Sequence, residues 1–241
     1  MRDGALPAAH GAWLVLLTGL LLGTLVGGTA TAGSMALALT AIAVFCAGER
    51  LVVAWTSKTP HPTALRSGLV AAAAAAVTGI WTLVEVGPGR LVWLVPCALL
   101  LVLLEKRLAT SRHRRKEFEF VGMTGLVLAL PAASIATGCP IGWPIAALSL
   151  AFLIHVGHAV FRTHAHLQPQ NRVVARWVAV GGAVIVLALM ATGSLAWPIG
   201  VAVLVGLAEP WAPTWSPLPA KKVGRRETLL ILALPLAWWI A

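Results

Sequence analysis

The chain has 241 residues, of which 59% are hydrophobic and only 11% are charged, and its formal net charge is +10. A soluble domain carries about 25% charged residues, so this composition excludes an ordinary soluble protein and predicts an integral membrane protein. The positive charge does not indicate nucleic-acid binding, because the basic residues lie in short segments between apolar runs, as in the cytoplasmic loops of membrane proteins.

The apolar runs predict nine transmembrane helices in a single domain that covers residues 1–241. A bilayer needs about 20 apolar residues per helix, and segments rich in glycine and proline separate the runs. We interpret the first run as a retained helix, since it lacks a convincing cleavage site for a signal peptidase. The expected helices cover about residues 10–27, 34–55, 63–85, 90–107, 118–136, 144–161, 173–191, 195–208 and 227–241.

A basic segment, Glu105–Phe120, sets the expected orientation. Short loops rich in Lys and Arg stay in the cytoplasm. If the N-terminus is also cytoplasmic, the loops after the second, fourth, sixth and eighth helices are cytoplasmic, and only Arg90 of the 18 Lys and Arg residues falls on the other side. We therefore expect a multi-pass protein of the cell membrane with a cytoplasmic N-terminus and an external C-terminus.

The sixth predicted helix carries ionisable residues on one face. His155, His158 and Arg162 stand at positions i, i+3 and i+7, which lie on the same side of a helix. Ionisable residues inside a span are costly and usually face a bundle interior or a water-filled cavity. Arg162 is therefore a candidate for binding an anionic head group, and the two histidines are candidates for a general base or acid if the protein is an enzyme.

The other candidate ligand-binding residues are His10, Arg50, Arg107 and Arg172, all near the predicted cytoplasmic side. His10 has a simpler interpretation as an interfacial packing residue, and a functional one in which it meets the histidines of the sixth helix. No metal-ligand set and no cofactor is predicted, because the histidine spacing is not diagnostic of a metal site. The three cysteines, Cys46, Cys97 and Cys139, are expected to be packing residues.

The segment Pro7–Trp13, which reads PAAHGAW, resembles the start of the YwiC-like family of integral membrane proteins. The basic segment 105–117, the helix exit Val160–Thr163 and the late stretch Pro219–Glu227 continue this resemblance along the chain. The resemblance implies a multi-pass helical fold and no particular activity.

The predicted arrangement of nine helices also resembles the UbiA-type intramembrane prenyltransferases, whose active cavity faces the cytoplasm. Those enzymes hold Mg²⁺ and a diphosphate with Asp-rich motifs at the ends of helices 2 and 6. Here the corresponding segments, Cys46–Arg50 and His155–Gln170, contain no aspartate. The resemblance therefore implies a cytoplasm-facing cavity without the usual Mg²⁺-diphosphate chemistry.

The sequence favours a protein that binds or modifies an amphipathic anionic ligand, such as an isoprenoid, a quinone or a lipid, in a cavity that faces the cytoplasm. If it is an enzyme, it is expected to be a degenerate UbiA-like transferase. Two alternatives use the same basic surface: a transporter of small anions, and a membrane subunit that binds haem or a metal.

Overall fold

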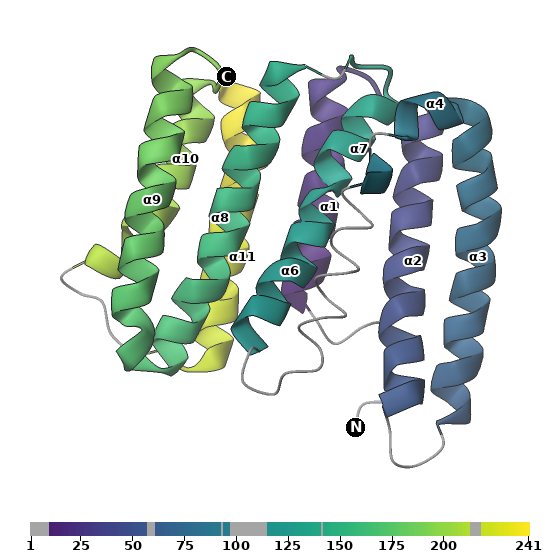
Figure 1. Ribbon diagram of the computed structural model, residues 1–241, viewed down its shortest axis with the longest axis horizontal. Coiled ribbons are helices and arrows are strands. Elements are labelled where there is room, and N and C mark those ends of the chain that lie inside the picture. Colours follow the sequence, from purple (N-terminus) through teal and green to yellow (C-terminus); the bar gives the residue numbers. More distant parts are fainter. Residues whose placement is uncertain (1–9, 57–60, 93, 97–114, 141, 213–217) are drawn as a thin grey trace.

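The computed structural model describes residues 10–56, 61–92, 94–96, 115–140, 142–212 and 218–241. All regular secondary structure in these residues is helical, which confirms the predicted all-α fold (Figure 1). The α-helices are α1 (His10–Val26), α2 (Ala32–Thr56), α3 (Pro62–Val86), α4 (Pro88–Leu91), α6 (Arg115–Val127), α7 (Ala129–Ala136), α8 (Trp143–Leu167), α9 (Arg172–Ala191), α10 (Trp197–Ala208) and α11 (Ala220–Ile240). Two short 3-10 helices, η1 (Pro169–Asn171) and η2 (Glu209–Trp211), follow α8 and α10.

Local sequence signals explain where several helices begin and end. Proline stands in the first turn of α3, α4, α8 and α10, where its missing N–H group costs no hydrogen bond. The turn at Gly87 requires glycine, because its φ angle is +84°. The apolar runs and their glycine and proline boundaries therefore predict most of the helices.

Among the residues that the structure describes, four helical segments are long and apolar enough to cross a membrane: 32–51, 62–86, 143–167 and 169–191. In α3 only 11% of the apolar window is buried inside the protein, and large apolar side chains such as Val84 and Val77 lie exposed on its surface. This outward apolar surface is consistent with a lipid bilayer around the helices.

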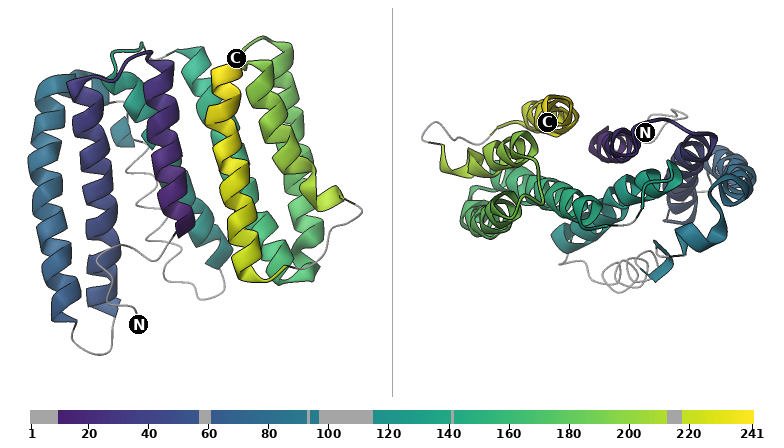
Figure 2. Two further views of the ribbon diagram at one scale, coloured as in Figure 1. Left: turned by 180° about the vertical axis from the view of Figure 1, so that it is seen from behind. Right: turned by 90° about the horizontal axis from the view of Figure 1, so that it is seen from above.

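The helices are arranged as a row with a hairpin at one end (Figures 1 and 2). The hairpin of α2 and α3 packs through α2 on α7 and α1, while α8, α9, α10 and α11 form a second group at the opposite end. The largest apolar core joins α1, α6 and α7 to this second group, around residues such as Phe152, Leu130 and Ile199. The second group is the part of the molecule that holds the polar cluster described below.

The described basic residues lie towards one end of the bundle. Except for Arg90, every Lys and Arg on the described helices is in the half of its helix that points to the end where α3, α6, α9 and α11 begin (Figure 1). We call this end the basic end. The one-sided distribution agrees with the loop alternation expected from the sequence.

Three helix boundaries differ from the sequence prediction. The polar segment after residue 161 was expected to be a loop, yet α8 continues to Leu167, and α11 begins at Ala220 instead of residue 227. The predicted helix 118–136 is divided at Leu128 into α6 and α7, because Pro131 lacks the N–H group that would bond to the carbonyl of Val127. Most of the predicted helix 90–107 lies outside the described residues.

Candidate functional site: a buried ion-pair network beside η2

The polar residues of α8 form a buried stripe along one face. His155, His158, Arg162 and His166 each expose 2% or less of their surface. The stripe runs from His155, the middle residue of α8, to the last turn at the basic end. As the spacing predicted, these side chains face the interior between α8, α10 and α11 and not the outer surface.

All three nitrogen atoms of the Arg162 guanidinium donate hydrogen bonds to acceptors on two other helices. Its Nε atom donates to Oε1 of Glu227 at 2.7 Å, and its Nη2 atom donates to Oε2 of the same carboxylate on α11. Its Nη1 atom donates to the backbone carbonyl of Gly206 on α10. A fully buried arginine with a bidentate carboxylate partner is a strong electrostatic contact that fixes α8 against α11.

Glu209, the first residue of η2, links three cationic or ionisable side chains. Its Oε1 atom lies 3.1 Å from Nε2 of His166 and 2.8 Å from Nη1 of Arg226, and its Oε2 atom lies 3.7 Å from Nε of Arg162. The Glu209 side chain is only 5% exposed, whereas that of Arg226 is 43% exposed. Arg226 is therefore the member of the network that reaches the surface.

The rings of the two inner histidines, His155 and His158, are closely packed but make few hydrogen bonds. Nδ1 of His158 lies 3.4 Å from Nη1 of Arg162, and Nε2 of neither His155 nor His158 has a hydrogen-bond partner among the described residues. The ring of His155 lies against Gly206, where an added Cβ atom would be 2.8 Å from its Cε1 atom. Gly206 therefore allows α10 to approach the histidine stripe closely.

A groove opens beside this network, between α10 and α11. It has a volume of about 450 Å³. Apolar side chains form most of its wall, while Glu209 and Arg226 line its polar end. We call it the α10–α11 groove, and its lining residues are Val205, Ala208, Glu209, Trp211, Ala212, Arg226 and Leu230.

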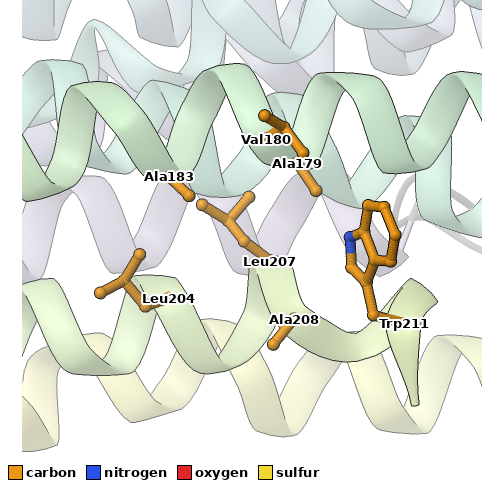
Figure 3. A pocket seen from close by; sticks show the side chains of 7 residues that line it. All are labelled: Ala179, Val180, Ala183, Leu204, Leu207, Ala208 and Trp211. Atoms are coloured by element: carbon orange, nitrogen blue, oxygen red, sulfur yellow. The ribbon is translucent and has the colours of Figure 1, made fainter. Parts of the chain in front are cut away.

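A second groove lies on the other side of α10, between α9 and α10 (Figure 3). We call it the α9–α10 groove. It has a volume of about 260 Å³ and is lined by Ala179, Val180, Ala183, Leu204, Leu207, Ala208 and Trp211. The guanidinium of Arg176 lies 4.8 Å from the centre of the Trp211 ring, and its Nε atom donates to the carbonyl of Pro210 at 3.2 Å. A cation therefore stands at the η2 end of this groove too.

The family model of the YwiC-like protein matches residues 6–134, which is more than half of the chain. This protein belongs to the YwiC-like family. No curated protein and no solved structure matches the chain. The likeness to the UbiA-type prenyltransferases therefore stays a prediction from the sequence.

The family match in this YwiC-like protein ends within α7, at residue 134. The ion-pair network and both grooves are built from α8, α9, α10, η2 and α11, after the matched region. The family assignment therefore carries no information about these residues, and any role for them must be argued from their geometry.

The remaining candidate ligand-binding residues do not gather at one place. Arg50 lies on α2, beside Gly68 of α3, in the hairpin at the opposite end of the molecule (Figure 1). Arg172 lies near η2, where its Nε atom donates to the carbonyl of Pro210 at 3.0 Å. His10 is the first residue of α1, but its side chain lies outside the described part of the chain, as does Arg107.

Sequence reasoning missed the acidic half of the network. We found no acidic residue near the α8 histidines in the sequence, because Glu209 and Glu227 are 43 and 65 positions from their partners on α8. The sequence feature that could have identified them is their position: Glu209 ends one apolar run, and Glu227 begins the next. Within the described segments, no three His, Cys, Asp or Glu side chains converge as a metal site.

Proposed function

We propose that this YwiC-like protein is a multi-pass protein of the cell membrane that binds an amphipathic ligand with an anionic head group. The proposed site is the α10–α11 groove at the basic end of the bundle. Because short basic segments stay in the cytoplasm, this end is proposed to face the cytoplasm.

The observation that carries this proposal is the division of the α10–α11 groove into two chemically different parts. Val205, Ala208 and Leu230 form an apolar wall, and Arg226 stands at the polar end. The volume of about 450 Å³ is within the usual range for small-molecule sites. Such a groove suits a hydrocarbon chain that ends in a charged group.

The charge of the polar end favours an anion. Arg162 and Glu227 neutralise each other inside the protein, so the charges that face the ligand come from the exposed part of the network. Glu209 offsets the charge of Arg226, which is 43% exposed. The excess positive charge at this end therefore comes from Lys222 and Arg225, which are exposed on the same helix. Basic clusters at the cytoplasmic ends of helices attract the anionic head groups of lipids.

The burial of His155 and His158 argues for binding in preference to acid–base chemistry in this groove. Both rings are 1% exposed, and neither lines a groove described above. A general acid or base must come within hydrogen-bond distance of the reacting group. The function proposed here is therefore binding of the amphiphile, with the histidines as part of the packed support behind the site.

The test is native mass spectrometry of the detergent-purified protein, with identification of the lipids that remain bound. Wild type is compared with Arg226→Gln and with a control, Arg66→Gln, which removes one exposed charge from α3, at the same end of the bundle but away from the groove. We expect wild type and the control to retain an anionic amphiphile and Arg226→Gln to lose it. Equal retention by all three proteins would contradict the proposal.

A further inference from the structure

The two grooves lie on opposite sides of one helix and share one end. Leu204 and Leu207 of α10 face the α9–α10 groove (Figure 3), and Val205 of α10 faces the α10–α11 groove. Ala208 and Trp211 line both grooves. The two open grooves therefore lie side by side and meet at Ala208 and η2.

A basic side chain is attached to each end of η2. Arg226 contacts Glu209, the first residue of this short helix, at 2.8 Å. Arg176 lies over the ring of Trp211, its last residue. A 3-10 helix rises about 2 Å per residue, so the two η2 residues that these arginines contact, Glu209 and Trp211, are about 4 Å apart along the helix axis.

Each of these cations keeps capacity for a further ligand. In the described part of the chain, Arg176 has the Pro210 carbonyl as its hydrogen-bond partner through Nε, and Arg226 contacts Glu209 through Nη1. An arginine has five N–H donors. The remaining donors are available to the oxygens of one phosphate that lies over η2.

From this geometry we infer that the ligand is a two-chain anionic phospholipid that sits astride α10, with one acyl chain in each groove and its phosphate between Arg176 and Arg226. The inference rests on the proposed function and narrows it from amphiphiles in general to one class. A single-chain isoprenoid or quinone would fill the α10–α11 groove and leave the α9–α10 groove outside the site. The indole of Trp211, which contacts both grooves, suits the boundary between acyl chains and head group.

The experiment fills only the α9–α10 groove. Ala183→Phe places a ring in it, and Val180→Phe does so from the neighbouring turn of α9. Val184→Phe is the control, because Val184 is 64% exposed and does not line either groove. Native mass spectrometry titrations use phosphatidylglycerol, which has two chains, lysophosphatidylglycerol, which has one, and phosphatidylcholine, which carries no net charge.

We expect Ala183→Phe and Val180→Phe to weaken phosphatidylglycerol binding roughly tenfold, since each buried methylene contributes to lipid affinity. Lysophosphatidylglycerol binding is expected to be unchanged in both variants, and Val184→Phe is expected to match wild type with every lipid. Thermal unfolding in detergent shows whether each variant is folded. If one of the two filling variants is not, the lipid titrations of the other one test the inference.

The outcomes separate this inference from the proposed function. If the filling variants bind phosphatidylglycerol as wild type does, the two-chain inference is wrong while the α10–α11 site stands. Phosphatidylcholine has the same phosphate next to a choline cation, so if it binds as tightly as phosphatidylglycerol, the preference for an anionic head group is wrong. If Arg226→Gln leaves the binding of both anionic lipids unchanged, the proposed function itself fails.

Discussion

Arg162 of α8 and Glu227 of α11 form a bidentate ion pair with no solvent access on the arginine side, where the side chain is 0% exposed and the glutamate is 12% exposed. The Nε to Oε1 distance is 2.7 Å. The pair joins two helices that are separated by α9 and α10 in the sequence, and it lies directly behind the proposed lipid site. It is therefore the structural support of that site.

Removing one partner of this pair is expected to destabilise the protein strongly. Glu227→Gln removes the bidentate partner of a buried guanidinium and leaves only Glu209, which is 3.7 Å away and also contacts His166 and Arg226. Breaking a buried pair costs about 3 to 5 kcal/mol, and we expect a loss at the lower end of this range. Thermal unfolding in detergent, followed by loss of the monodisperse peak on gel filtration, measures the effect. The control Arg225→Gln changes an exposed charge on the same helix and is expected to keep the wild-type transition; a similar transition for Glu227→Gln would show that the pair adds nothing to stability.

The close approach of α10 to α8 predicts a second effect on stability. In Gly206→Ala the new Cβ atom would lie 2.8 Å from Cε1 and 3.1 Å from Nδ1 of the buried His155 ring. Overpacking of this kind costs about 1 to 3 kcal/mol. Gly181→Ala is the control, since its Cβ atom meets nothing within 4 Å, and the same unfolding assay compares the two. A Gly206→Ala protein as stable as the control would mean that the helices separate at little cost.

The two buried histidines are expected to respond differently to replacement by leucine. His155→Leu removes a ring whose hydrogen bond goes to the neutral backbone at Leu230 and not to a charged group, and it is expected to cost about 1 kcal/mol. His158→Leu removes the ring nitrogen that lies 3.4 Å from Nη1 of Arg162, and it is expected to cost more. Chemical denaturation in detergent gives both values, and the reverse order would contradict the assignment of these contacts.

The position of the basic end predicts the topology of the chain. A reporter that fluoresces only in the cytoplasm is expected to be active when inserted after Gln168, between α8 and α9, and inactive when fused to Ala241. A phosphatase reporter that needs the external side is expected to give the opposite pattern. The physical reason is the location of nearly all described Lys and Arg residues at the end that contains Gln168. External activity at Gln168 would reverse the proposed orientation.

The sequence predicted the elements of this fold better than their contacts. Apolar runs of bilayer length marked the helices, and the spacing of His155, His158 and Arg162 predicted their shared face, because both signals are local. The predicted end of α8, at about residue 161, was wrong for a physical reason. His166 and Arg162 look like loop residues in the sequence, but partners from η2 and α11 stabilise them inside a helix, and such distant partners leave no local pattern.

The grooves were beyond sequence reasoning for a similar cause. Trp211 lies in a segment rich in proline and tryptophan, and nothing near it in the sequence points to Arg176. Their contact depends on how α9 packs against η2. The candidate residues Arg50 and Arg162 show the opposite error. Both lie at the basic end, but Arg50 is on α2 in the hairpin and Arg162 is on α8 in the second group of helices.

The 65 positions between Arg162 and Glu227 also have a consequence for biosynthesis. During translation α8 leaves the ribosome well before α11, so its arginine enters the forming bundle without its carboxylate. Until α11 arrives, that charge must stay hydrated, which holds the end of α8 near the membrane surface. A helix made later therefore completes the insertion of one made earlier, and this step of assembly neutralises a charge.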